Sequence, residues 1–145
     1  MVILNRRVLC IDPGQKRIGI ASSDETGTIA TPYRIINHLS KSKDAEAIIE
    51  IAQEIGAGQI VIGIAIGLES EKTLSARRAA NLAHEISSHT NIPVSLWDES
   101  ESTNEAFLTI SKSGKNRKKK GRRIDDLAAT IVLQSFLENM KSRLE

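Results

Sequence analysis

The stretch RVLCIDPGQKRIGIASSD, residues 7–24, decides the fold that the sequence predicts. Residues 7–12 form a short apolar run that ends at Asp-Pro-Gly, a strong turn signal. A second run of strand character, residues 17–24, follows after a gap typical of a β-hairpin. A third, residues 28–36, comes after Gly27, and Pro32 within it favours an edge strand because proline lacks an N–H for a neighbouring strand. Three consecutive strands joined by short turns predict an antiparallel meander.

After the meander, helical spacing and short apolar runs alternate along the chain. We predict helices over residues 44–55, 73–88, 102–110 and from about 124 to 140, with strands over residues 59–64 and 94–97. In the helix over 73–88 the inward-facing candidates include Leu74, Ala80, Ala83 and Ile86. Through residue 110 these elements follow the order βββαβαβα, and the helix from about 124 comes after them. This order predicts an α/β fold with one mixed five-stranded sheet. Three antiparallel strands would be followed by parallel ones, with helices on both faces.

Length and composition limit the class of protein. A chain of 145 residues, with 40% hydrophobic and 26% charged residues, predicts a single globular domain over residues 1–145. No apolar run approaches the roughly 18 residues of a membrane span, and the N-terminus does not resemble a signal peptide. The only cysteine, Cys10, lies in an apolar run and cannot form an internal disulfide. We therefore expect a cytoplasmic protein without a membrane partner, as a monomer or a homodimer.

The formal net charge of +2 averages two opposite features. Residues 112–123 contain eight basic side chains: Lys112, Lys115, Arg117, Lys118, Lys119, Lys120, Arg122 and Arg123. Removing these eight from the 20 basic residues leaves 12 against 18 acidic ones, a formal charge of −6. A basic segment without aromatic residues is typical of phosphate attraction without base stacking. We expect a mobile basic loop that orders on nucleic acid; a solvated charged loop is the alternative.

Acidic residues stand where three predicted elements begin or end. Asp12 ends the first strand, Asp98 and Glu99 end the last strand, and Asp125 and Asp126 begin the last helix. In α/β sheets, ligands collect at the carboxyl ends of parallel strands. Carboxylates about 4 Å apart repel by about 4 kcal/mol at an effective dielectric of 20, so such a cluster calls for Mg²⁺ or Mn²⁺. Taken singly, each residue also fits a structural role. Asp12 can start a β-turn, and Asp98 and Glu99 can be polar residues that follow a buried strand. Asp125 and Asp126 can complement the positive end of the helix dipole.

Four stretches in collinear order resemble the YqgF/RuvX family of bacterial RNase H-like proteins. The first is IDPGQKRIGIA, residues 11–21; the second is residues 61–63 with 68–69. The third is Trp-Asp-Glu at residues 97–99 with residues 102–106, and the fourth is residues 124–137 of the last helix. The resemblance covers essentially the whole chain. It implies an RNase H-like fold and a metal-dependent nuclease that trims the 5′ end of pre-16S rRNA, with cleavage of branched, four-way DNA junctions as the alternative.

Carried over by motif, the family's catalytic and metal-binding acids fall on Asp12, Glu99 and Asp125, with Asp98 and Asp126 as backups. We predict nucleic-acid contacts at the basic residues of the first hairpin and the basic segment: Lys16, Arg17, Lys115, Arg117, Lys118, Lys119, Lys120, Arg122 and Arg123. Ser100 stands where the family has arginine, which leaves a non-catalytic RNA-binding assembly factor as a further alternative. An ATPase-like relative is disfavoured because the chain shows no second phosphate motif.

Overall fold

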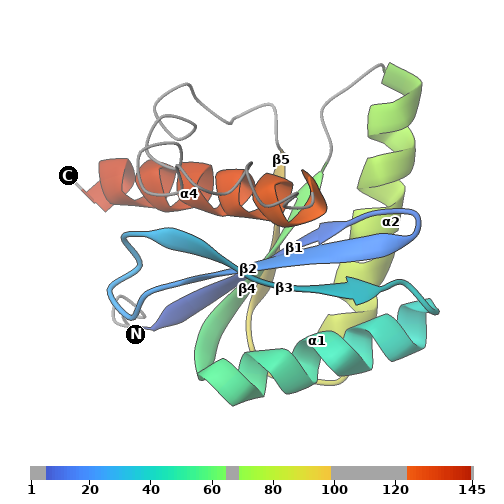
Figure 1. Cartoon of the computed structure of the whole chain (residues 1–145), viewed down its shortest axis with the longest axis horizontal. Coiled ribbons are helices and arrows are strands. Elements are labelled where there is room, and N and C mark those ends of the chain that lie inside the picture. The colour runs from blue at the N-terminus through green and yellow to red at the C-terminus, as the bar shows by residue number, and fades with distance from the viewer. Residues whose placement is uncertain (1–5, 65–68, 99–123, 145) are drawn as a thin grey trace.

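The computed structural model describes residues 6–64, 69–98 and 124–144 (Figure 1). Its strands are β1 (Arg7–Pro13), β2 (Arg17–Ser23), β3 (Ala30–Asn37), β4 (Ala57–Ile64) and β5 (Val94–Asp98). Its helices are α1 (Lys41–Ile55), α2 (Glu69–Ser87) and α4 (Ile124–Leu144). The predicted helix over residues 102–110 and the basic segment at 112–123 lie outside the described residues.

The five strands form one mixed sheet in the order β3-β2-β1-β4-β5. β1 pairs antiparallel with β2, and β2 pairs antiparallel with β3. β4 then joins β1 in parallel, and β5 joins β4 in parallel. The predicted mixed sheet is confirmed, and β3, which contains Pro32, is an edge strand as expected.

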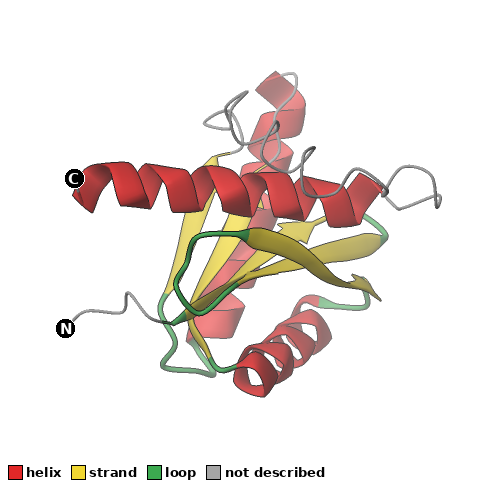
Figure 2. Cartoon of the chain, turned by 60° about the vertical axis from the view of Figure 1, so that its left-hand side comes forward, coloured by secondary structure: helices red, strands yellow, loops and turns green. Residues whose placement is uncertain are grey.

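The sheet has two covered faces, because side chains alternate along each strand. Leu9 and Ile11 of β1 pack into a core under α1 and α2. Val8 and Cys10 pack into a second core under α4. Figures 1 and 2 show α4 on one side of the sheet and α1 and α2 on the other. We call these the α4 face and the α1/α2 face.

The β1–β2 hairpin closes tightly around Gly14. Its N–H donates to the carbonyl of Arg17 at 3.0 Å. A Cβ added at Gly14 would lie 2.5 Å from that carbonyl oxygen, which is well inside van der Waals contact. Only glycine therefore fits here without a shift of the backbone.

Two helices begin at positions that differ from the prediction. α1 starts at Lys41 rather than Asp44, because the side chain of Ser40 accepts a hydrogen bond from the N–H of Lys43 and caps the helix. α2 starts at Glu69 rather than Thr73.

The predicted inward face of α2 is wrong in part, because Leu74 is 55% exposed and Ala80 is also exposed. From residue 73 onward, where its side chains are described, the buried residues of that helix are Ser75, Ala79, Leu82 and Ile86, a stripe with helical spacing of four, three and four residues. The buried stripe includes the small polar Ser75 and excludes its larger apolar neighbour Leu74. Contact with the sheet and α1, rather than hydrophobicity residue by residue, therefore decides which side of α2 faces inward.

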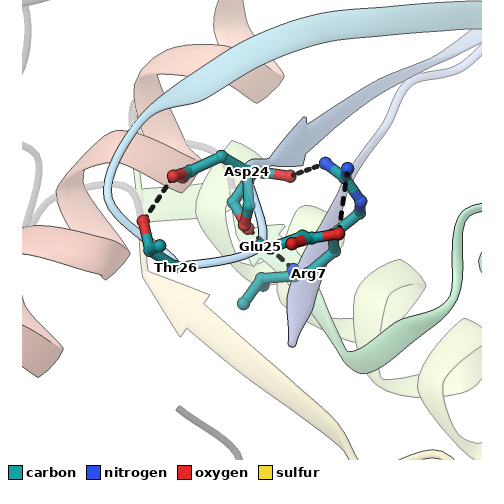
Figure 3. A network of polar contacts seen from close by, with 6 residues as sticks. Arg7, Asp24, Glu25 and Thr26 are labelled. Atoms are coloured by element: carbon teal, nitrogen blue, oxygen red, sulfur yellow. Dashed lines mark hydrogen bonds and ion pairs between the residues drawn. The ribbon is translucent and has the colours of Figure 1, made fainter. Parts of the chain in front are cut away.

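The β2–β3 turn is held by Asp24 (Figure 3). Burial acts to raise the pKa of this carboxyl, but hydrogen bonds from the N–H groups of Ile29 and Thr28 and from the hydroxyl of Thr26 outweigh it and lower the pKa to about 2. Arg7 closes the turn from β1: its Nη1 donates to the Ser23 carbonyl at 3.1 Å, and its Nη2 lies 3.9 Å from Glu25. The turn is thus tied to the start of β1.

Candidate active site

Asp12 lies near the carboxyl end of β1, where it pairs with Gly19 of β2. Its side chain is partly buried. Asp12 follows Val8 and Cys10 at strand spacing, so it belongs to the α4 face. The sequence predicted that Asp12 lies at a strand end, and the packing of Val8 and Cys10 under α4 shows which face of the sheet it occupies.

Asp98 ends β5 at the same end of the sheet, because Asp98 pairs with Ile64 at the end of β4. β4 separates β5 from β1, so the ends of these two strands are about 10 Å apart. Trp97 packs on the core under α4, with its ring in T-shaped contact with Phe136 at 5.4 Å between centroids. Asp98 is the next residue and therefore belongs to the α1/α2 face, opposite to Asp12.

Glu99, the preferred acid of this pair, lies outside the described residues. It follows Asp98 directly in the sequence. The structure thus describes the backup residue and places it on the other face from Asp12.

A glutamine near the middle of α4 anchors that helix to the β2–β3 turn. The buried side chain of Gln134 accepts a hydrogen bond from the Ala30 N–H at 2.9 Å and donates to the Thr28 carbonyl at 3.1 Å. Ala30 starts β3 and pairs with Ser23 at the end of β2. This turn lies at the end of the sheet opposite to Asp12, so the middle of α4 is anchored there.

The first turn of α4 lies over the end of the sheet that holds Asp12. From Gln134 back to Asp125 the helix rises about 14 Å. From Val8, whose N–H bonds to Ser23 beside the anchored turn, to Asp12 the strand rises about 13 Å. Figures 1 and 2 both show the start of α4 over the end of the sheet where β1 turns into β2. The backbone of Asp125 lies in this first turn; its side chain and that of Asp126 are not described.

Two of the three predicted positions, Asp12 on β1 and Asp125 on α4, therefore lie at one end of the sheet. The end of β5, which leads into Glu99, lies at the same end. Within the described residues no group of three potential metal ligands is found. An aspartate oxygen from the α4 face of the sheet suits a hard divalent cation such as Mg²⁺ or Mn²⁺.

Of the predicted nucleic-acid contacts, only the two in the β1–β2 hairpin are described. Lys16 and Arg17 are exposed at its tip, next to the strand end that carries Asp12. The basic residues at 112–123 are outside the described part of the chain, so their predicted role stays a prediction.

Sequence reasoning missed a pair beside this hairpin. His38 and Asp44 lie 2.5 Å apart between Nδ1 and Oδ2, and the Asp44 side chain is only 5% exposed. The available signal was Ser40, a helix-capping residue just before residues of helical spacing, which puts Asp44 in the first turn of α1.

Comparisons with known proteins agree with this geometry. A protein of Paramagnetospirillum magneticum (strain ATCC 700264 / AMB-1) named "Putative pre-16S rRNA nuclease" is 34% identical over 139 residues, which cover 93% of this chain and 87% of the relative. Among solved structures, Thermus thermophilus RuvC in complex with a Holliday junction substrate matches with a TM-score of 0.62 at 12% identity, over 96% of each chain. The human cytomegalovirus terminase nuclease domain, soaked with Mn, matches with a TM-score of 0.58 at 14% identity, over 96% of this chain and 86% of that one.

The two structural matches show the fold, which is that of RNase H-like nucleases. Together with the relatives, they place the chain among the hydrolases of phosphodiester bonds. The chain belongs to the RuvX family: the family model described as "Holliday junction resolvase" matches residues 6–139. The resemblance noted in the four sequence stretches is thereby confirmed. In the described part of the chain, no helix is long and apolar enough to cross a membrane.

Proposed function

We propose that this chain is a divalent-metal-dependent nuclease that cleaves structured RNA, with Asp12, Glu99 and Asp125 as its catalytic acids. The observation that carries the proposal is the meeting of three elements at one end of the sheet: the end of β1 with Asp12, the end of β5 that leads into Glu99, and the first turn of α4 with Asp125. The position of Asp98 on the opposite face supports Glu99 as the second acid.

The three carboxylates would hold Mg²⁺ or Mn²⁺. A bound cation of this kind stabilises charge on the phosphate and lowers the pKa of a bound water. The chain's own contribution is positional. β1 holds Asp12 at a strand end, and Gln134 anchors the middle of α4, whose first turn lies over the same end of the sheet as Asp12. The partly buried setting of Asp12 strengthens its interaction with a cation relative to water.

The substrate we propose is pre-16S rRNA, processed at its 5′ end in the cytoplasm during ribosome maturation. The name of the Paramagnetospirillum relative supports this choice. Lys16 and Arg17 beside Asp12, together with the basic residues at 112–123, supply positive charge for the phosphate backbone.

The test is cleavage of a labelled pre-16S rRNA fragment by the purified protein with Mn²⁺, with EDTA, and by the Asp12→Asn variant. We expect cleavage that EDTA abolishes and a rate for Asp12→Asn lower by about 100-fold or more. Asp98→Asn is the matched control, because its carboxylate is equally close to a strand end but belongs to the other face. Equal cleavage by the parent and by Asp12→Asn would contradict the catalytic assignment.

Two other functions have specific support. The family description and the Holliday junction bound to Thermus thermophilus RuvC favour a nuclease of four-way DNA junctions. Offering a four-way junction and the rRNA fragment at the same salt concentration separates the two substrates. Ser100, in place of the family's arginine, favours a non-catalytic RNA-binding assembly factor. That function predicts RNA binding that survives EDTA and no cleavage with any metal.

A further inference from the structure

We propose that the β1–β2 hairpin tip and the start of α1 form one phosphate-binding surface, which guides a nucleic-acid strand away from the catalytic end of the sheet. It consists of Lys16, His38, Lys41 and Lys43, and we call it the His38 surface. The inference rests on the proposed function for the identity of the ligand, and it adds His38, Lys41 and Lys43 to the nucleic-acid contacts.

A backbone contact joins the two segments of this surface. The N–H of His38 donates to the carbonyl of Lys16 at 2.9 Å. Just before it, Arg17 pairs with Asn37 in the β2–β3 register. The hairpin tip and the β3–α1 connection therefore lie side by side, although they are more than 20 residues apart in sequence.

A buried carboxylate holds His38 in place. Asp44 contacts His38 Nδ1 through Oδ2 and accepts the Leu39 N–H through Oδ1 at 2.9 Å. The His38 side chain is 40% exposed, whereas that of Asp44 is 5% exposed. Burying a carboxylate is costly unless it is paired and hydrogen-bonded, so this pair gives the imidazole a defined orientation.

The orientation has a consequence for the second ring nitrogen. With Nδ1 directed at Asp44, Nε2 is the nitrogen left for a ligand, and within the described residues it makes no hydrogen bond. When both nitrogens carry a proton, the imidazolium bridges the Asp44 carboxylate on one side and an anionic oxygen on the other. A phosphate oxygen of the nucleic-acid backbone is the ligand that fits this chemistry.

The lysines of the His38 surface also differ from other basic residues of the protein in their ion pairing. Elsewhere, Arg7 at the start of β1 lies 3.9 Å from Glu25, and Arg34 in the middle of β3 lies 3.5 Å from Glu54. In contrast, Lys16, Lys41 and Lys43 are exposed, and in the part of the chain that the structure describes none of them forms an ion pair. These cations are therefore available to an external anion.

The distance of this surface from Asp12 suits a strand that passes the catalytic end. Lys16 lies three residues before Gly19, the register partner of Asp12, and so at most about 10 Å from it along the chain. That distance corresponds to about three nucleotides of stacked strand. Lys41 and Lys43 both lie in the first turn of α1, about 200° apart around the helix axis, so they stand on either side of the Asp44 that holds His38.

The test measures binding of a fluorescein-labelled RNA hairpin with a single-stranded 5′ extension, in EDTA, with every protein carrying Asp12→Asn. The salt dependence of the affinity is compared for the parent, His38→Gln, the double variant Lys41→Gln/Lys43→Gln, and Lys141→Gln. Lys141 is the matched control: it is an exposed lysine near the end of α4, remote from Asp12. Because Lys41 and Lys43 are exposed, their replacement leaves the fold intact even if His38→Gln, which disturbs Asp44, does not fold.

For the double variant we expect affinity about five- to tenfold weaker near 150 mM salt and a log–log salt slope smaller by about 1.4, since each phosphate contact to a single strand contributes about 0.7. For His38→Gln we expect a slope smaller by up to about 0.7. Lys141→Gln should match the parent.

Affinities and slopes of the double variant within twofold of the parent would overturn the proposal. If the double variant binds more weakly and the unsubstituted protein with metal does not cleave, the His38 surface is supported and the proposed catalysis is refuted. If the double variant binds like the parent and the unsubstituted protein cleaves with metal, the His38 surface is refuted and the proposed catalysis is supported.

Discussion

Replacement of Gln134 by leucine tests the anchor that holds the middle of α4 on the β2–β3 turn. Gln134 is 2% exposed, and its amide bridges two backbone groups of the β2–β3 turn, the Ala30 N–H and the Thr28 carbonyl. Leucine has a similar volume, so the change removes the hydrogen bonds without opening a large cavity. The variant Gln134→Leu therefore isolates the polar contribution of the anchor.

The magnitude follows from the two bonds and the groups they leave behind. Each lost hydrogen bond contributes about 1 kcal/mol, and a buried N–H without a partner costs about 1–3 kcal/mol. Ala30 is 4% exposed, so water does not readily replace the lost acceptor. We expect the free energy of unfolding to fall by about 3 kcal/mol, which for a chain of this size lowers the melting temperature by about 6–12 °C.

The assay is urea unfolding followed by circular dichroism, supported by thermal melts. Lys141→Gln is the control, because Lys141 is exposed near the end of the same helix and its replacement should change stability by less than about 0.5 kcal/mol. A loss below about 1 kcal/mol for Gln134→Leu would refute the reasoning that these two bonds hold α4 on the turn.

Three further predictions concern single positions. In a metal-dependent cleavage assay, Glu99→Gln should lower the rate of cleavage by about 100-fold or more. Asp98→Asn should stay within about fivefold of the parent, because strand alternation places Asp98 on the α1/α2 face. Equal losses for the two variants would contradict this. The pKa of Asp24 is about 2 in the folded chain against 3.8 for the ordinary carboxyl, so its stabilisation is present above about pH 4 and disappears as the pH falls toward 2. Asp24→Ala should therefore cost about 1 kcal/mol near neutral pH, after allowance for solvent screening, and much less at pH 2, as measured by melts across pH. Gly14→Ala should lower stability by about 1–3 kcal/mol, because its Cβ would meet the Arg17 carbonyl oxygen at 2.5 Å; a melting temperature equal to the parent's would show that the hairpin shifts freely.

Several features of the fold and the site were predictable from the sequence because they depend on near neighbours. The strand runs in residues 7–24, the turn at Gly14 and the helical spacing before Gly56 all act over a few residues, and the order βββαβαβα follows from them. The position of Asp12 at a strand end belongs to the same class of information. The mixed sheet was also predictable, because hairpin spacing implies antiparallel pairing and helical crossovers imply parallel pairing.

The tertiary structure decided which face each side chain occupies and which distant groups meet. Neighbouring residues of a strand lie on opposite faces of the sheet, and Asp98 lies on the face opposite to Asp12. The register of β5 on β4, rather than local sequence, decides which face Asp98 occupies. The hydrogen bond from Ala30 to Gln134 spans 104 residues, and no local pattern encodes it. Packing against the sheet and α1 likewise chose Ser75 over Leu74 for the buried side of α2. The sequence by itself thus determined the elements and the chemical types at their ends, whereas packing between distant segments determined how those ends converge, because only contacts across the chain distinguish one face of an element from the other.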